Sequence, residues 1–422
     1  MPRALLAGLA LATLHAAPIT AQNDLSPARR AEVAARVLST VERYFVHWDD
    51  LPAGFDLHDA FRAYTERLMA APDRRAAAFV TMRFVASLGN SHTGFFDNVV
   101  YEDAGVGHHF TADWIDGRWM VTGSERDDLR PGDVIAEIDG RPFEEFYREQ
   151  GPILSASTDR FRRHQLFQRP RRYLFPLRYT LTLDDGRTVT VDRRGTEDAP
   201  PPDSTTGRWL VPNRVALIRV PSWNAGRFQD RAMELLREYR DAEAIVVDVR
   251  GNGGGSTPLT FMQALMDRPW QWWSEATPLR LGLYSYYAES RGGTFVDFLR
   301  PTMAWPAEWV PKADSAYAGK VVILADQGCH SACEDFVMPF RFTGRGTVIG
   351  SQTAGSTGQP YFGQLGDGMS IAVGTKREFF PDGTRFEGVG IAPTIEVRPT
   401  RDDVRSGRDP VLARALAELG VR

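Results

Sequence analysis

Unbroken apolar runs, each followed by a helical pattern, constrain the fold of this chain more than any other feature. Val321 to Ala325 is one such run of five residues, and Ala244 to Val249 is a second strand-like segment. Runs of this length predict strands that are buried on both faces, as in a parallel sheet. Helical patterns at residues 335–342 and 258–266 follow these two strands. The alternation predicts an α/β domain with a largely parallel sheet.

Two corners in this segment indicate chemistry. Ser331 lies between the strand at 321–325 and its helix, where the first free N–H groups of the helix face whatever binds. Such a corner suits a nucleophile whose product is an oxyanion, although a helix N-cap is the alternative role for Ser331. The other corner is the glycine cluster at 248–255, which exposes backbone N–H groups at close range.

Composition excludes several classes of protein. The 422 residues are 43% hydrophobic and 25% charged, which is typical of a globular protein with two or three domains. A net charge of −4 argues against a nucleic-acid partner. The eight histidines show no metal-ligand spacing, and the adjacent His108 and His109 point apart on a strand. We therefore expect neither a metal nor another cofactor.

The N-terminal segment has the pattern of a signal peptide. Arg3 precedes an apolar run from Ala4 to Ala17, and Ile19 to Ala21 offers a small-residue cleavage site. The pattern predicts a signal peptide at residues 1–21, with a buried N-terminal helix as the alternative. Later apolar runs are too short to span a bilayer. We expect a mature protein without stable membrane insertion, located in a periplasm or secreted.

Helical spacing dominates residues 22–100, which we predict to be an N-terminal helical domain. Apolar positions recur at Val33, Val37 and Val41, and a later helix ends at Gly89 and Asn90. His92 follows directly, within Ser-His-Thr-Gly. Its alternative role is to satisfy the free carbonyl groups at the helix end.

Short strand patterns follow at residues 101–200 and resemble a PDZ-type module. Residues 129–140 contain Leu-Arg-Pro-Gly-Asp-Val-Ile and Ile-Asp-Gly, and a hairpin pattern surrounds Asp184 to Arg187. Gly105, Val106 and Gly107 stand where such modules bind the terminal carboxylate of a peptide through backbone N–H groups. A packing module without a ligand is the alternative.

The α/β catalytic core is predicted at residues 207–400, followed by a C-terminal helix within 401–422. An insertion at 268–318 is rich in aromatic residues and forms either a satellite core or a wall of an apolar substrate cleft. The aromatic residues are Trp270, Trp272, Trp273, Tyr284, Tyr286, Tyr287, Trp305 and Trp309.

Taken in order, these motifs resemble the tail-specific, or C-terminal processing, serine protease family, in particular its tricorn-core-like branch. The resemblance covers nearly the whole mature chain and ends in Glu-Gly-Val-Gly-Ile at residues 387–391. It implies a multidomain α/β protein with a crotonase/ClpP-like catalytic core, an N-terminal helical domain and a PDZ-like β-rich module. It also implies an endopeptidase that cleaves polypeptides near their C-termini.

The resemblance assigns a role to each site residue. Ser331 is the nucleophile, His92 the general base, and Ser91 and Glu387 complete a charge relay. The N–H groups of Gly254 and Ala332 form the oxyanion hole. A serine hydroxyl needs a base within hydrogen-bond reach, and the base needs a group that holds its tautomer. With an ordinary histidine pKa, activity would rise between about pH 6 and 7.

One departure concerns the better-known branch of the family, which uses a Ser-Lys dyad. Ser356 stands where that lysine would be, and the three lysines of the chain, Lys312, Lys320 and Lys376, are poorly placed for the role. A displaced dyad and a non-catalytic protein that binds peptides or hydrophobic ligands on the same fold remain the alternatives.

Cys329 and Cys333 are the two cysteines of the chain and bracket Ser331. Export and the even number favour a disulfide. Helix geometry opposes it, because an i, i+4 pair on a helix separates the Cβ atoms too widely for a bridge. We therefore expect two free, buried thiols.

Overall fold

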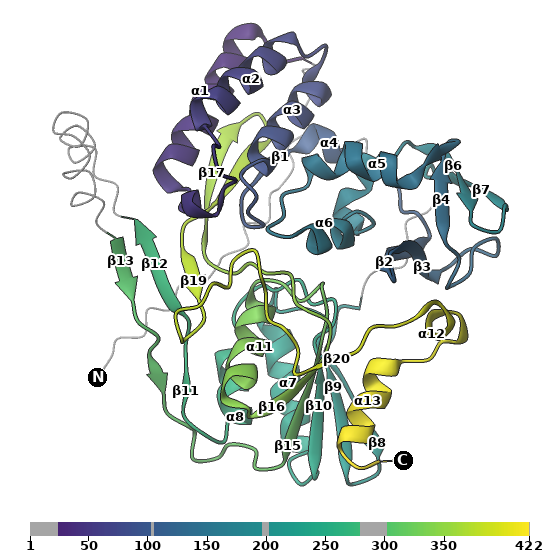
Figure 1. Ribbon diagram of the computed structural model, residues 1–422, viewed down its shortest axis with the longest axis vertical. Helices are drawn as coiled ribbons and strands as arrows, with labels where there is room; N and C mark the ends of the chain where they lie inside the picture. Colours follow the sequence, from purple (N-terminus) through teal and green to yellow (C-terminus); the bar gives the residue numbers. More distant parts are fainter. Residues whose placement is uncertain (1–23, 103–104, 196–201, 279–301, 422) are drawn as a thin grey trace.

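The computed structural model describes residues 24–102, 105–195, 202–278 and 302–421 (Figure 1). The predicted signal peptide at 1–21 and three aromatic residues of the insertion, Tyr284, Tyr286 and Tyr287, lie outside these ranges. Within the described residues, no helix combines the length and the apolar character needed to cross a membrane.

A six-stranded sheet forms the core of the C-terminal half. In pairing order, its strands are β20 (Ile395–Glu396), β16 (Gly346–Gly350), β15 (Lys320–Ala325), β10 (Ala244–Asp248), β9 (Val215–Arg219) and β8 (Thr206–Val211). The pairs from β20 to β9 are parallel, and β8 is antiparallel to β9. The predicted largely parallel sheet is therefore confirmed.

Helices cover both faces of this sheet, which explains the unbroken apolar runs. Alternate side chains such as Ile245 and Ile323 pack with three helices on one face, whereas Val246 and Val322 pack with a fourth helix on the other. The three helices are α7 (Gly226–Glu238), α8 (Leu259–Leu265) and α11 (Ala332–Thr343), and the fourth is α13 (Pro410–Glu418). A short helix, α12 (Arg401–Ser406), precedes α13.

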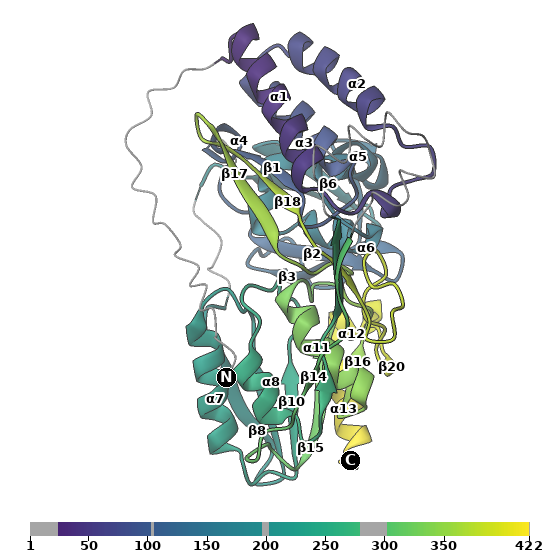
Figure 2. The same ribbon diagram turned by 90° about the vertical axis from the view of Figure 1, so that its left-hand side faces the viewer.

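The N-terminal helices lie at the opposite end of the molecule from the six-stranded sheet (Figures 1 and 2). Each is capped by a side chain: Ser26, Asp56 and Asp73 accept hydrogen bonds from first-turn N–H groups. The helices are α1 (Pro27–Tyr44), α2 (Leu57–Ala70) and α3 (Arg74–Ala86), and the short η1 (Trp48–Asp50) follows α1.

Strand β1 (Gly94–Asp97) joins this N-terminal part to the C-terminal half. It pairs antiparallel with β18 (Met369–Gly374), which also pairs with β17 (Pro360–Gly366). Arg29 of α1 adds an ion pair with Asp367 at 2.7 Å. The pairing places the segment just before β1, which includes His92, against the C-terminal half.

The predicted β-rich part contains two small sheets and several short helices. One sheet pairs β2 (Phe110–Ile115) with β3 (Arg118–Ser124), and the other has the order β5-β4-β6-β7. Its strands are β4 (Ile135–Ile138), β5 (Arg141–Pro142), β6 (Arg178–Leu183) and β7 (Thr188–Asp192). The helices are α4 (Asn98–Glu102), α5 (Phe143–Gln150), η2 (Gly151–Ile153), α6 (Asp159–Gln165) and η3 (Arg169–Leu174).

The described parts of the aromatic insertion form two β pairs. Trp270 and Trp273 are each 1% exposed and belong to the main core beside the six-stranded sheet rather than to a separate satellite core, whereas Trp309 is 67% exposed. The strands are β11 (Trp270–Gln271), β12 (Ser274–Pro278), β13 (Thr302–Trp305) and β14 (Trp309–Val310), and β12 also pairs with β19 (Arg377–Phe379).

The expectation of free thiols is wrong, because Cys329 and Cys333 form a disulfide with their Cα atoms 5.3 Å apart. The spacing rule for two residues on one helix does not apply to this pair. Helix α11 begins at Ala332, so Cys329 belongs to the corner before the helix. A turn there, in which the Cys333 N–H donates to the His330 carbonyl, brings the two residues together.

Candidate active site

Ser331 occupies the predicted corner between β15 and α11 in an unusual backbone conformation. Its φ and ψ are 57° and −126°, a backbone region that residues other than glycine adopt at a cost in energy. The corner is held by the Ser331 N–H, which donates to the Ser356 carbonyl at 3.1 Å, and by the Ser331 carbonyl, which accepts from Glu334 at 2.7 Å. The Ser331 side chain makes no capping hydrogen bond, so the N-cap alternative lacks its defining contact.

His92 lies within hydrogen-bond distance of two hydroxyl groups. Its Nε2 is 3.0 Å from Ser331 Oγ, and its Nδ1 is 2.9 Å from Ser356 Oγ. If Nε2 accepts from Ser331, Nδ1 carries the proton and donates to Ser356. The backbone of His92 is held by Asn90, whose Oδ1 accepts the His92 N–H at 3.0 Å.

Glu387 is buried behind these groups. Its Oε1 accepts hydrogen bonds from Asn90 Nδ2 at 2.8 Å and from Ser157 Oγ at 2.5 Å. Burial raises the pKa of the Glu387 carboxyl, and interactions with the Ser157 and Ser356 hydroxyls act in the opposite direction. The other carboxylate oxygen of Glu387, Oε2, is buried and makes no hydrogen bond with the described residues.

The position predicted for Ser91 is different in the structure. The Ser91 hydroxyl lies 3.0 Å from Ser157 Oγ and accepts the Ser157 N–H at 2.9 Å, so it reaches Glu387 only through Ser157. Ser356, rather than Ser91, contacts the His92 ring. The sequence signal for Ser356 was its place at the dyad lysine position, whereas Ser157 stood in a stretch without a recognised pattern.

The electrostatic surroundings keep His92 neutral. Burial, together with the neighbouring His330 and His47, lowers the pKa of His92 well below its usual 6.5. The His330 ring stacks on the His92 ring with centroids 4.8 Å apart, and burial lowers the pKa of His330 to about 4. The expected rise in activity between pH 6 and 7 assumed an unperturbed imidazole, and with the pKa of His92 lowered by burial we expect this rise at lower pH.

Of the two N–H groups that were predicted to bind the oxyanion, that of Gly254 already has an acceptor in the protein. At Gly254, with φ +92°, an added Cβ would lie 2.8 Å from the Ser331 Cβ and 3.0 Å from the Ala332 nitrogen, so a side chain there would fill the corner. The Gly254 N–H, however, donates to Asn252 Oδ1 at 2.9 Å. Ala332 is the first residue of α11, where an N–H has no intrahelical acceptor.

Lys376 is the first lysine after Ser356, the residue that stands at the dyad position, and its amino group forms ion pairs with carboxylates. Its Nζ is 2.7 Å from Glu275 and 3.2 Å from Glu378, and its pKa is raised, although burial acts in the opposite direction. Lys320 begins β15 and is exposed at the end of the strand far from Ser331. A protonated, ion-paired Lys376 is unsuited to accept a proton from a serine.

The loop that was predicted to bind a peptide carboxylate forms hydrogen bonds within the protein instead. The Val106 N–H donates to the Arg193 carbonyl at 2.9 Å, and Arg193 Nε donates back to the Val106 carbonyl at 3.2 Å. A Cβ at Gly105 would lie 2.6 Å from Leu177. Of the three predicted amides, that of Val106 is therefore not free to bind a peptide carboxylate.

No group of acidic, histidine or cysteine side chains that could hold a metal ion occurs in the part of the chain that the structure describes.

Comparison with known proteins identifies relatives of the core and of the whole fold. The sequence profile of peptidase family S41 matches residues 214–397. Tricorn protease homolog 2 of Streptomyces coelicolor is 25% identical over 416 residues, which cover 89% of this chain and 31% of that protein. The carboxyl-terminal-processing protease of Synechocystis is 26% identical over 180 residues, 42% of this chain and 37% of that protein. The chain thus spans about a third of the length of these curated relatives.

Among solved structures, mature CPAF in complex with lactacystin has the same fold. The TM-score is 0.70 at 14% identity, over 93% of this chain and 98% of that one. This similarity confirms the predicted multidomain α/β fold, whereas the domain boundaries and the roles of the site residues stay predictions.

Proposed function

We propose that this chain, a member of peptidase family S41 through residues 214–397, is a serine endopeptidase that forms an acyl-enzyme on Ser331. The observation that carries the proposal is the contact of 3.0 Å between Ser331 Oγ and His92 Nε2. A hydroxyl within this distance of a neutral imidazole can transfer its proton as it attacks a carbonyl carbon.

The first step is the attack of Ser331 Oγ on the peptide carbonyl, while His92 Nε2 accepts the hydroxyl proton. The carbonyl oxygen becomes an oxyanion, and the Ala332 N–H at the start of α11 supports it. Gly254 can add a second donor when its N–H exchanges the Asn252 side chain for the oxyanion. The imidazolium then donates its proton to the leaving amine, and the C–N bond breaks.

Hydrolysis of the acyl-enzyme repeats the transfer with water. His92 accepts a proton from water, the hydroxide oxygen bonds to the acyl carbon, and Ser331 leaves with the proton returned by His92. During both steps Ser356 Oγ holds His92 Nδ1 at 2.9 Å, and the buried Glu387 carboxylate, whose Oε2 has no hydrogen-bond partner among the described residues, completes the relay when Ser356 donates to it. Ser157 and Asn90 hold Glu387, and Ser91 holds Ser157.

Export and cleavage near C-termini are the finer parts of the proposal. The N-terminal apolar run supports export, and the Cys329–Cys333 disulfide supports an oxidising compartment such as a periplasm. The name of the Synechocystis relative, carboxyl-terminal-processing protease, supports cleavage near the C-termini of polypeptides.

Labelling with a fluorophosphonate probe, followed by peptide mapping, tests the proposal. We expect the probe on Ser331 of the folded protein, loss of labelling in Ser331→Ala, and much slower labelling in His92→Ala. The alternative of a non-catalytic binding protein predicts that Ser331 stays unlabelled while the protein is folded. That result would overturn the proposed function.

A further inference from the structure

A stack of three rings lies beside the nucleophile. The ring of His330 lies nearly parallel to that of His92, with centroids 4.8 Å apart and an angle of 21° between the planes. It also lies nearly parallel to the ring of Phe161 from α6, with centroids 4.6 Å apart and an angle of 14°. His330 directly precedes Ser331, so the corner that carries the nucleophile also carries a ring that contacts the base.

Hydrogen bonds of His330 hold its ring in this corner. The His330 N–H donates to the Asn252 carbonyl at 3.1 Å, and the ring forms a hydrogen bond with the backbone of Gly253. Nε2 of the ring is buried and has no hydrogen-bond partner among the described residues, so Nδ1 makes the bond to Gly253. Burial lowers the pKa of His330 to about 4, and the ring is therefore neutral near pH 7.

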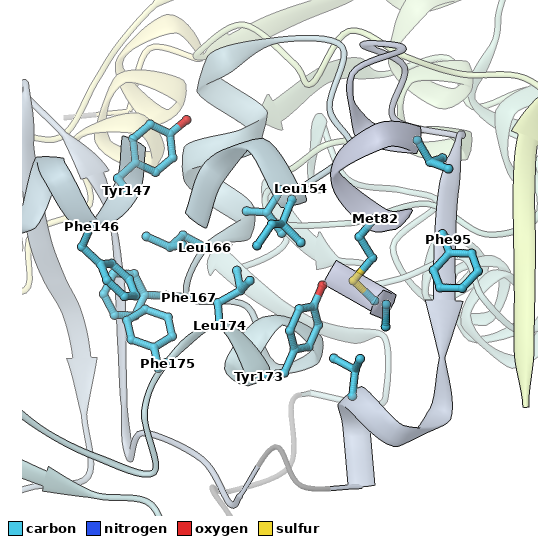
Figure 3. Packing of buried hydrophobic residues seen from close by; sticks show 14 of the residues in the cluster. Met82, Phe95, Phe146, Tyr147, Leu154, Leu166, Phe167, Tyr173, Leu174 and Phe175 are labelled. Carbon is cyan, nitrogen blue, oxygen red and sulfur yellow. The ribbon is translucent and has the colours of Figure 1, made fainter. Parts of the chain in front are cut away.

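Helix α6 supports the third ring of the stack, that of the buried Phe161. At the start of the helix, the hydroxyl of the N-cap residue Thr158 donates to the Ala354 carbonyl at 2.8 Å. Just after the helix, the ring of Phe167 packs on that of Phe175 in the core, with centroids 5.1 Å apart (Figure 3). Phe161 is therefore held from both ends of α6 and keeps the His330 ring in place.

A neutral ring that stacks on the base affects the reaction in two ways. Rotation of the His92 ring would remove its contacts with Ser331 and Ser356, and a nearly parallel neighbour opposes this rotation. The His92 ring also becomes positively charged when it accepts the serine proton, and the face of a neutral ring stabilises a cation. The second effect acts only once the proton moves, so it lowers the barrier without strengthening substrate binding.

We propose that His330 is a positioning residue for the base: its ring aligns the His92 ring with Ser331 and stabilises the imidazolium that forms there. The inference rests on the proposed function and adds a residue to it. It also gives the β-rich part of the chain a role in the centre, because Phe161 supports the stack from α6. The competing role for His330 is to hold the glycine cluster through the bond to Gly253.

Two substitutions in the full-length protein separate these roles. His330→Phe keeps a flat ring and removes the bond to Gly253, whereas His330→Asn keeps a donor and removes the ring. The readout is the maximal rate of labelling by a fluorophosphonate, together with the probe concentration that gives half of it. We expect the maximal rate to stay within about threefold of wild type in His330→Phe and to fall by about 10- to 30-fold in His330→Asn. The half-saturating concentration should stay within about twofold in both.

Phe161→Leu provides a second test, because it keeps an apolar side chain and removes the flat face behind His330. We expect a loss of about three- to tenfold in the maximal rate, again at an unchanged half-saturating concentration. Tyr239→Leu is the matched control, since it removes a ring contact of 5.0 Å with Trp209 at the outer strand β8. It should lower Tm and leave the labelling rate within twofold. Circular dichroism melting establishes that each variant is folded, and Phe161→Leu decides if His330→Asn is unfolded.

NMR of protein labelled with ¹⁵N-histidine reports which ring nitrogen of His92 carries the proton. We expect the proton on Nδ1 in wild type and in His330→Phe, and a mixture of tautomers in His330→Asn.

Two results would overturn the inference: a maximal labelling rate in His330→Asn within twofold of wild type, or an equal loss in His330→Phe and His330→Asn. The second result would assign His330 to the glycine cluster instead. Failure of the proposed function gives a different pattern, in which the wild-type protein is not labelled at all. The His92 tautomer then decides: a change in His330→Asn alone supports the positioning role, and no change overturns it.

Discussion

The centre around Ser331 and the loop at Gly105 to Gly107 use their hydrogen bonds in opposite ways. At the centre, the contacts of His92 with Ser331 and Ser356 form a chain that proton transfer can use. In the loop, the N–H and carbonyl groups of Val106 are both satisfied by Arg193. A backbone position that suits binding is not enough, because the donor must also be without an internal acceptor.

The largest effect should follow from loss of the base at the centre. His92→Ala removes the acceptor of the Ser331 proton, so we expect kcat to fall by about 10³-fold or more. Lys320→Ala, far from the corner, is the control and should stay within about twofold of wild type. Steady-state kinetics with a peptide substrate measure both. Activity that survives in His92→Ala and disappears in Lys376→Ala would show a displaced dyad instead.

The next effect separates the two serines that were candidates for the relay. Ser356→Ala removes the hydroxyl that contacts His92 Nδ1, and we expect kcat to fall by about 10- to 100-fold because the imidazole loses the group that holds its tautomer. Ser91→Ala should cost less than about fivefold, because Ser91 acts through Ser157. The two kcat values, compared under the same conditions, decide the order. A larger loss of kcat in Ser91→Ala than in Ser356→Ala would show that Ser91 is the serine of the relay.

The pH dependence provides a smaller effect. The base must be neutral to accept a proton, so a lowered pKa of His92 preserves activity at lower pH. A base with a pKa of about 6.5 would lose roughly tenfold in kcat/KM between pH 7.5 and 5.5, and we expect a loss of less than about threefold. The profile of kcat/KM from pH 4.5 to 8 measures it. A midpoint at or above 6.5 would contradict the burial argument.

The smallest effect is expected at the loop. Val106→Glu places a negative charge where a peptide carboxylate was predicted to bind, and it should raise KM for a peptide with a free C-terminus by less than about twofold. The reason is that the Val106 N–H already donates to Arg193. Val106→Gln is the matched neutral control. A rise in KM of tenfold or more with the glutamate alone would restore the loop as the carboxylate site.

The core elements could be predicted because burial and periodicity act locally. The runs at 244–249 and 321–325 correspond to β10 and β15, and the corner at Ser331 lies where the pattern changes from strand to helix. The positions of His92 and Glu387 followed from motifs, and the pairing of β1 with β18 brings their segments together.

Hydrogen-bond partners were harder to predict than positions. Ser91 is adjacent to His92 in the chain, but Ser356 approaches the ring from a loop that Glu334 holds through the Gly355 and Ser356 N–H groups. The prediction of two free thiols was wrong for a related reason, because the exact start of α11 decides the distance between Cys329 and Cys333. Such details depend on contacts across the fold that no local pattern reports.

The pairing of β1 with β18 also bears on how the protein folds. His92 and Ser331 are 239 positions apart in the chain, and Asn90 and Glu387 are 297 positions apart. The proposed nucleophile and base come together through strands that are distant in the sequence, and the proposed relay needs Glu387, which follows later still in the chain. Closing such long loops makes the assembly of the centre a late event in folding.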